Sequence, residues 1–273
     1  MFQYEFIQNS FITGLIIGVI APLLGVFIVV RRMSLIADAL SHVTLAGIAF
    51  SMFLQKINPA FIMLSPLFSG ILFSVFGAVL IEKLRTVYRH YQELAIPIIL
   101  SAGMGLSVIF ISLADGFNTD LFTYLFGSVS AVTRIDTVTI IIVAIIVLSI
   151  IVTFYKEWFL LSFDEEHAKA SGVKTGLFQI LFIVLVALVI ASSMRIVGIL
   201  LVSSLMTLPV AASIRIAKGF KQTIFLSIIF GEIAVIGGMF LAYYIDLAPG
   251  GTIVMISVLI LLCTILWKKV SRR

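Results

Sequence analysis

The sequence predicts an all-α, polytopic membrane protein with about nine transmembrane helices, or eight on an alternative count. Apolar residues make up 62% of its 273 residues and charged residues only 11%, against about 45–50% and 25% in soluble domains. The mean hydropathy is +1.25, and the apolar residues gather in runs long enough to cross a bilayer core of about 30 Å. A water-soluble globule is excluded, because so few charges could not cover its surface.

Nine apolar runs follow one another, and residues 1–273 are expected to form a single transmembrane domain. The runs at 176–192 and 196–213 are separated by only three residues, so they predict either a tight helical hairpin or one broken element. This ambiguity is the basis of the eight-helix alternative. The semi-polar segment 118–132 predicts a short helix or loop that does not span. The runs cover residues 10–30, 38–55, 60–81, 95–114, 135–155, 176–192, 196–213, 222–245 and 251–267.

The basic residues alternate between the two sides of the predicted bundle. Fifteen of the 18 Lys and Arg residues follow odd-numbered runs, and only Lys56, Arg134 and Arg195 do not. Cytoplasmic loops carry the excess of positive charge, so we expect the N-terminus outside and the C-terminus in the cytoplasm. The same grouping accounts for the net charge of +5 without a nucleic-acid partner. The regular alternation favours nine crossings.

Asp38 and His42 are charged or polar groups at the start of an apolar run. Their spacing of four places them on one face of a helix, about 6 Å apart along its axis. Carboxylate oxygen and imidazole nitrogen are ligands that suit Zn²⁺, Mn²⁺ or Fe²⁺. Two ligands are too few for tight binding, whereas a two-fold homodimer would supply four. The alternatives are a helix N-cap for Asp38 and a packed, hydrogen-bonded role for His42.

Glu232 lies within the eighth run, and Asp246 lies at its outer end. Ionisable groups inside a membrane are costly and often functional. Two interpretations of Glu232 stay open: a proton or ion relay, or a structural partner of a Ser or Thr on a neighbouring helix.

The segment 162–172 predicts a short cytoplasmic helix of about nine residues. Ser162 and Glu165 have the spacing of a capping box, the acidic residues 164–166 suit a helix N-terminus, and Gly172 is a plausible stop. This segment is either a solvated helix within a cytoplasmic loop or a docking helix that transmits motion from a soluble partner. The chain has no GxxxxGK[ST] nucleotide-binding signature, so any ATP that drives the protein must bind to another chain.

Four stretches resemble the permease subunits of bacterial ABC importers for zinc, manganese and iron. They occur in the family order over nearly the whole chain, and the first and third are the more specific. The stretches are GVFIVVRRMSLIADALSH (25–42), FDEEHAKASG (163–172), VGILLVSSLMTLP (197–209) and APGGTIV (248–254).

The resemblance implies a homodimeric permease in the bacterial cell membrane, with two cytoplasmic ATPase subunits and an extracellular metal-binding protein that delivers a divalent metal. Such a permease holds no permanent cofactor and is not an enzyme, since ATP is hydrolysed on the partner subunit. Asp38 and His42 would line the metal path. The residues implied in coupling to the ATPase are Asp164, Glu165, Glu166, Ala168 and Gly172.

The expected metal is zinc, with manganese or iron as alternatives. Zinc members of the family often have the sequence Leu-Ala-Gly after the path histidine, as in residues 45–47. Two rival functions are a proton-coupled secondary transporter that uses Glu232 and Asp246, and an intramembrane metalloenzyme that uses Asp38 and His42. The second rival lacks an HExxH motif and a third ligand.

Overall fold

The computed structural model describes residues 4–58, 65–114, 116 and 119–270, and in these ranges the regular structure is entirely helical. The helices are α1 (Glu5–Val30), α2 (Ile36–Ile57), α3 (Pro66–Val87), α4 (Ala95–Leu113), α5 (Thr119–Phe126), α6 (Arg134–Thr153), α7 (Tyr155–Phe163), α8 (Glu165–Ala170), α9 (Thr175–Val197), α10 (Ile199–Ile216), α11 (Phe220–Ile245) and α12 (Pro249–Val270), with 3-10 turns η2 (Gln92–Leu94) and η3 (Val129–Ala131).

Eight helices in the described chain are long and apolar enough to cross a membrane. They are α1, α2, α3, α4 with η2, α6, α9, α11 and α12. This number matches the lower of the two predicted counts. The run at 196–213 forms α10, a shorter apolar helix of 18 residues, and α10 is therefore the element on which a ninth crossing depends. The beginning of the run at 60–81 lies outside the described residues.

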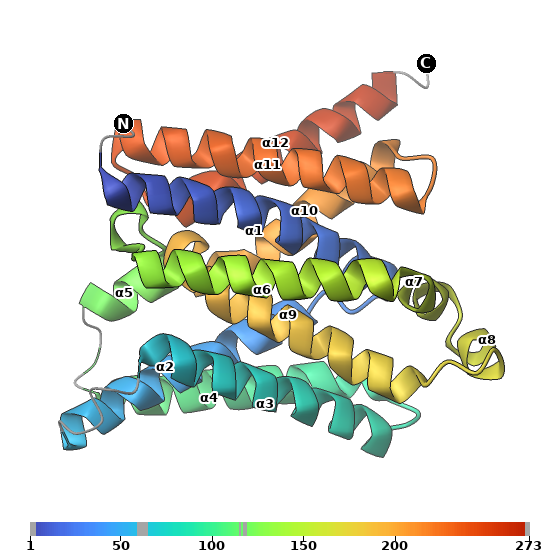
Figure 1. Cartoon of the computed structure of the whole chain (residues 1–273), viewed down its shortest axis with the longest axis horizontal. Helices are drawn as coiled ribbons and strands as arrows, with labels where there is room; N and C mark the ends of the chain where they lie inside the picture. The colour runs from blue at the N-terminus through green and yellow to red at the C-terminus, as the bar shows by residue number, and fades with distance from the viewer. Residues whose placement is uncertain (1–3, 59–64, 115, 117–118, 271–273) are drawn as a thin grey trace.

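The chain breaks between α9 and α10 at Gly198, not at residues 193–195 as the sequence suggested. Gly198 has φ +84° and ψ 145°, a backbone conformation that L side chains rarely adopt. A Cβ at this position would also lie 2.5 Å from the Leu125 carbonyl oxygen. The two helices diverge from this elbow in Figure 1. A glycine is therefore required here by both conformation and space.

Residues 193–195, which were predicted to separate the two runs, belong to α9. The Ser193 hydroxyl donates to the Val189 carbonyl and the Ser192 hydroxyl donates to the Leu188 carbonyl. A serine hydroxyl can donate its hydrogen bond to a backbone carbonyl one turn earlier in the same helix, so small polar residues need not end the helix.

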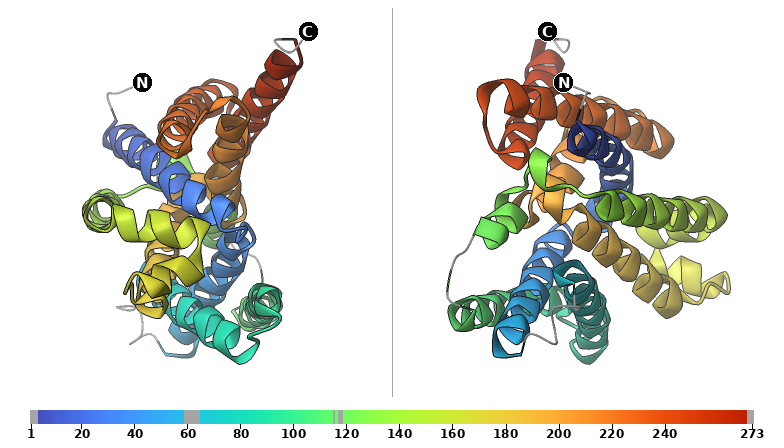
Figure 2. Two further views of the ribbon diagram at one scale, coloured as in Figure 1. Left: turned by 90° about the vertical axis from the view of Figure 1, so that its right-hand side faces the viewer. Right: turned by 60° about the vertical axis from the view of Figure 1, so that its left-hand side comes forward.

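The long helices divide into two groups joined by a central pair. Helices α2, α3 and α4 pack together on one side, and α1, α10, α11 and α12 on the other, with α6 and α9 between them (Figure 1). The N-terminus lies at the end of the bundle opposite α8, while the last turns of α12 lie toward the α8 end. The left view of Figure 2 looks onto the end that carries the short helices α7 and α8.

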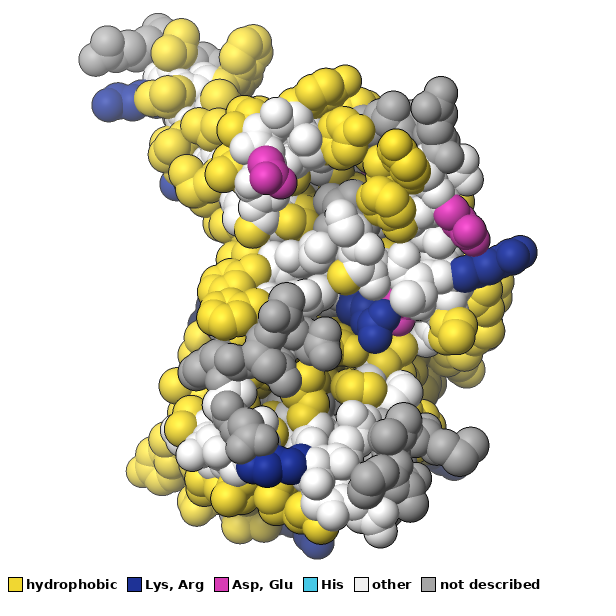
Figure 3. All heavy atoms as spheres, turned by 90° about the vertical axis from the view of Figure 1, so that its left-hand side faces the viewer, with side chains coloured by type: hydrophobic (Ala, Val, Ile, Leu, Met, Phe, Trp, Pro, Cys, Tyr) yellow, Lys and Arg dark blue, Asp and Glu magenta, His cyan; other side chains and the backbone are white. Residues whose placement is uncertain are grey.

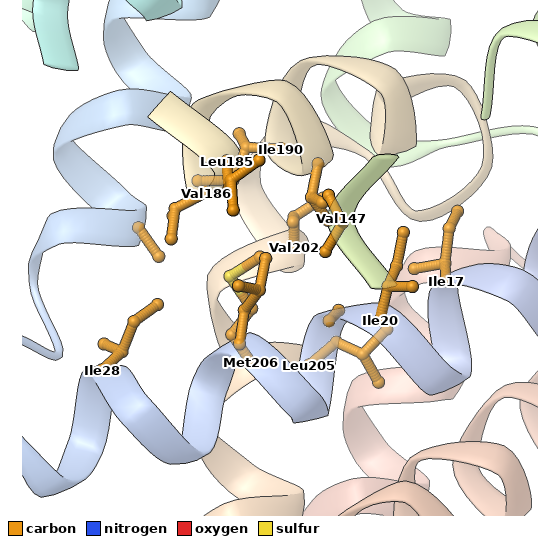
Figure 4. Close-up of a cluster of buried hydrophobic side chains, with 14 of the residues drawn as sticks. Ile17, Ile20, Ile28, Val147, Leu185, Val186, Ile190, Val202, Leu205 and Met206 are labelled. Atoms are coloured by element: carbon orange, nitrogen blue, oxygen red, sulfur yellow. The ribbon is translucent and has the colours of Figure 1, made fainter. Parts of the chain in front are cut away.

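The core lies where α1, α6, α9 and α10 cross. Figure 4 shows its apolar side chains converging from these four helices. Those that are labelled and buried are Ile17, Ile20, Ile28, Val147, Leu185, Val186, Ile190, Val202, Leu205 and Met206. The outward faces of α3, α4, α6, α11 and α12 also carry exposed large apolar side chains. Helices that are apolar on both faces need a bilayer as solvent.

Candidate metal path and coupling helix

Asp38 and His42 lie in the first turns of α2, and both side chains are partly buried. The helix begins at Ile36 with Leu35 as the N-cap residue, and no side chain caps it. The N-cap interpretation of Asp38 is therefore wrong. No hydrogen bond or ion pair joins Asp38 or His42 to another side chain in the described ranges, although His42 is within electrostatic reach of Asp38. Within the described ranges the two side chains therefore have no partner that would occupy their lone pairs.

The helix that carries the pair is enclosed by others. Helix α2 packs against α3 and α4 and also contacts α9 and α10. The backbone of α4 comes closest at Gly103, where an added Cβ would lie 2.9 Å from the Val43 nitrogen and 3.2 Å from the His42 carbonyl carbon. Because a backbone-to-backbone contact leaves little room for adjustment, the position of His42 is set by α4.

Ser41 is a further polar group on this face, and it was not predicted from the sequence. It lies three residues after Asp38, so the two share a face of α2. Its hydroxyl is buried and has no hydrogen-bond partner among the described residues, whereas the nearby Thr44 hydroxyl donates to the Leu40 carbonyl at 2.5 Å. Ser41 is therefore a buried hydroxyl without a hydrogen-bond partner in the described chain, close in sequence to Asp38 and His42. Its spacing of three residues from Asp38 is the sequence feature that could have placed it on the same face.

One chain supplies only part of a metal site. The described residues contain no group of three or more His, Cys, Asp or Glu side chains that could hold an ion. Stable zinc sites use about four ligands. A metal at Asp38 and His42 would need further ligands from water or from a second copy of the chain.

Helix α8 is shorter than predicted and begins later. Its cap is Asp164, whose carboxylate accepts a hydrogen bond from the His167 backbone N–H at 2.9 Å. Ser162 belongs to α7, and its hydroxyl donates to the Trp158 carbonyl at 2.7 Å. The predicted capping role of Ser162 is therefore wrong. The predicted stop is confirmed, since Gly172 follows the helix with φ +84°.

The residues implied in coupling divide by exposure. Asp164, Glu166 and Gly172 are exposed, while Ala168 is fully buried and seats the helix on its neighbours. Glu165 is half-buried and pairs with Lys169 at 3.2 Å. Helix α8 thus presents acidic side chains outward and attaches through one small apolar residue.

Arg31 links this end of the bundle to the segment that leads into α2. Burial lowers the pKa of its guanidinium to about 10, and Arg85 acts in the same direction, whereas Glu82 and Glu165 oppose the shift. The guanidinium also lies 5.4 Å from the centroid of the Phe182 ring. The chain that carries Asp38 therefore starts within electrostatic reach of both α3 and α8.

Glu232 and Asp246 are not brought together. They lie on α11 and at its C-cap, about 21 Å apart along the axis at 1.5 Å per residue. Glu232 packs against Gly18 of α1, and its buried Oε1 has no hydrogen-bond partner among the described residues. The expected Ser or Thr partner is not found there. A relay through both carboxylates is not supported by this arrangement.

A polar cluster that was not predicted from the sequence lies at the end of the bundle opposite α8. Arg195 donates to the Asp136 carboxylate at 2.8 Å and to the Tyr124 hydroxyl at 2.9 Å. The Thr133 hydroxyl donates to Asp136 at 2.7 Å. The cluster ties α5, α6 and α9 together, and it explains why a cation is tolerated near the end of α9. Figure 3 faces this end of the bundle and shows a few basic and acidic side chains among apolar ones.

Three features are those expected of a membrane permease: the bundle of long apolar helices, the Asp–His pair on an enclosed helix, and the small peripheral helix α8. The family model described as the ABC 3 transport family matches residues 3–268. The chain therefore belongs to this family. It is a multi-pass protein of the bacterial plasma membrane.

Similar proteins include metal permeases of two kinds. The chain is 37% identical to the manganese import system permease protein ScaB of Streptococcus gordonii, over 95% of this chain and 90% of that protein. It is 29% identical to the high-affinity zinc uptake system membrane protein ZnuB of Haemophilus influenzae, over 93% and 95%. A solved structure, PsaBC from Streptococcus pneumoniae in complex with Fab, matches with a TM-score of 0.81 and 33% identity, over 96% of this chain and 91% of that one.

These similarities confirm the family resemblance and the helical fold. The relatives are permease subunits rather than enzymes, so the metalloenzyme alternative is wrong. Membership of an ABC family also favours an ATP-driven mechanism over the proton-coupled alternative.

Proposed function

We propose that the chain is the permease subunit of an ATP-driven importer of a divalent metal, and that Asp38 and His42 form half of a transient metal site on its path. The observation that carries this proposal is the pair itself: a carboxylate and an imidazole on one face of an enclosed apolar helix, without a partner in the described chain. Such groups are costly at membrane depth unless they serve a ligand or a path.

The second half of the site comes from a second copy of the chain. A two-fold axis beside α2 would bring two carboxylates and two imidazoles together, which is the ligand number of a tetrahedral zinc site. A site on a transport path must also release its ion. Partly exposed ligands on two separate chains suit this requirement, because a small movement between the copies removes half of them.

Zinc is the proposed cargo, on the basis of its ligand chemistry and the Leu-Ala-Gly sequence at 45–47. Manganese is the second candidate, because the relative with the higher identity of the two is named as a manganese permease. Oxygen and nitrogen ligands bind Mn²⁺ more weakly than Zn²⁺, so the same side chains could pass either ion.

The N-terminus is proposed to lie outside, where an extracellular metal-binding protein delivers the ion. The C-terminus and α8 lie in the cytoplasm, where two ATPase subunits bind and hydrolyse ATP. This orientation requires α10 to cross the membrane as a ninth helix. Two observations support this orientation: the N-terminus and α8 lie at opposite ends of the bundle (Figure 1), and the basic clusters follow alternate runs. Asp164, Glu165, Glu166 and Gly172 would meet the ATPase, and Ala168 would pass its motion to α7 and α9.

The test is the metal content of cells that lack this gene and grow with limiting metal. The deletion strain is complemented with the gene for the wild-type protein, Asp38→Ala, His42→Ala or the control His90→Ala. The zinc, manganese and iron contents of the cells are then measured by elemental analysis. His90 is an exposed histidine outside the helices. We expect zinc to fall in the deletion strain and to be restored only by wild type and His90→Ala.

Other outcomes separate the parts of the proposal. A fall in manganese alone overturns the choice of zinc and leaves the path intact. Full restoration by Asp38→Ala and His42→Ala overturns the path site. If no metal changes, the import function itself is wrong.

A further inference from the structure

A polar cavity of about 510 Å³ lies beside α8. Helix α8 packs against α7 and α9, and the cavity separates it from the end of α3. Three segments form its walls: the end of α3 and the residues that follow it, one side of α8, and the first turn of α9. The side chains that matter here are Glu82, Arg85, Arg89, Glu165, Lys169 and Gln179.

Both carboxylates in the walls already have a partner on their own segment. Glu82 Oε2 lies 3.1 Å from Arg85 Nη1, and Glu165 Oε1 lies 3.2 Å from Lys169 Nζ. With three basic and two acidic side chains in these walls, one positive charge is left over. The cavity therefore has spare capacity for an anion.

The Gln179 side-chain amide is a buried hydrogen-bond donor without an acceptor in the described chain. Its side chain lines the cavity and is only 5% exposed, and its Nε2 is buried without a hydrogen-bond partner in the part of the chain that is described. Leaving a buried donor unpaired costs about 1–3 kcal/mol. An acceptor inside the cavity would remove that cost.

The N-terminal end of α9 lies at the same cavity. Thr175 and Gly176 also line the cavity, and the N-cap residue Lys174 makes no side-chain capping bond. The backbone N–H groups of Thr175, Leu177 and Phe178 are bonded to the Val173 and Lys174 carbonyls, so what the start of α9 contributes is the positive end of its helix dipole, which favours an anion.

Arg89 completes the set from the opposite wall. It is exposed, and no ion pair of its guanidinium is found within the described ranges. A carboxylate can accept hydrogen bonds from an arginine and an amide at once. The walls thus offer matched donors to a single acidic group.

We propose that this cavity receives a carboxylate side chain of the ATPase subunit, bound between the Gln179 amide and the Arg89 guanidinium. The inference rests on the proposed function, which places that subunit against α8. Charge complementarity argues for a protein partner. Helix α8 exposes the acidic Asp164 and Glu166, so its partner needs basic groups there and an acidic group at the neighbouring cavity.

The experiment measures the dissociation constant between the ATPase subunit and the full permease in lipid nanodiscs. We expect Arg89→Glu to weaken binding at least tenfold and Gln179→Leu about fivefold, since both remove donors and the first adds repulsion. Lys83→Glu is the matched control: an exposed basic residue on the same segment that is not among the cavity walls. It should change the constant less than twofold.

A charge-reversal screen then identifies the partner group. Each Asp and Glu on the ATPase face is changed to Lys and tested against Arg89→Glu, and one change should restore binding. If Arg89→Glu binds like wild type, or if no reversal restores it, the cavity proposal is overturned while the permease function stands. If the ATPase does not bind wild type at all, the proposed function fails instead.

Discussion

Helices α2 and α8 carry the two proposed sites, and the fold holds them in very different ways. Helix α2 is enclosed by α3, α4, α9 and α10, and α4 meets its backbone directly at Gly103. Helix α8 has six residues, contacts α7 and α9, and is seated by Ala168. A helix this short has no stability of its own. The proposed metal ligands therefore sit on a rigid element, and the proposed docking element can adapt to a partner.

The largest expected effect is on the enclosure of α2. Gly103→Leu forces a side chain into the His42–Val43 backbone, and overpacking of this kind costs about 3 kcal/mol or more. We expect little monodisperse protein by size-exclusion chromatography and a clear fall in melting temperature.

Gly105→Leu is the control for this change, because nothing lies within 4 Å of a Cβ at that position on the same helix. It should melt close to wild type. Equal behaviour of the two variants would show that α2 is not tightly enclosed.

The next effect concerns the cap of α8. Asp164→Ala removes the acceptor for the His167 N–H, and the loss of such a cap costs about 1 kcal/mol. We expect faster hydrogen exchange at residues 165–170 and about fivefold weaker ATPase binding. Ser162→Ala should do neither, because that hydroxyl bonds within α7. The opposite ranking would restore Ser162 as the cap.

A smaller effect of opposite sign is expected inside α2. Ser41→Ala deletes a buried hydroxyl that has no partner in the described chain, so the folded state loses an unsatisfied group. We expect the free energy of unfolding to rise by up to about 1 kcal/mol, measured as a higher melting temperature in metal-free buffer. A lower melting temperature would mean that the hydroxyl is bonded.

The smallest effect is on the surface of α8. Lys169→Gln breaks the Glu165 pair, whose side chains are 62% and 38% exposed. Exposed pairs at this spacing contribute less than about 0.5 kcal/mol. Melting curves of variant and wild type should therefore overlap in both low and high salt. A salt-dependent difference of several degrees would show that α8 is held by charge.

Much of the candidate site could be predicted because it depends on local periodicity. Asp38 and His42 share a face of α2 as their spacing required, and Gly172 ends its segment as a glycine often does. These predictions needed only the geometry of one helix.

The errors fell where distant residues decide the local structure. Helix α7 continues to Phe163 because Trp158 is buried against Phe27 and Phe182, which takes Ser162 away from α8. Helix α9 runs past Arg195 because Asp136 and Tyr124 satisfy that guanidinium. All four of these partners are distant in sequence from the residues they contact, so no local pattern could reveal them.

Composition and hydropathy alone were enough for the membrane class, the helical runs and the spacing of the Asp–His pair. They suffice because a bilayer leaves a chain few ways to satisfy its backbone other than long apolar helices. The closeness of Gly103 to His42, the elbow at Gly198 and the cavity beside α8 came only from the tertiary structure. Each depends on which helix faces touch, and that choice is made by close packing between segments far apart along the chain.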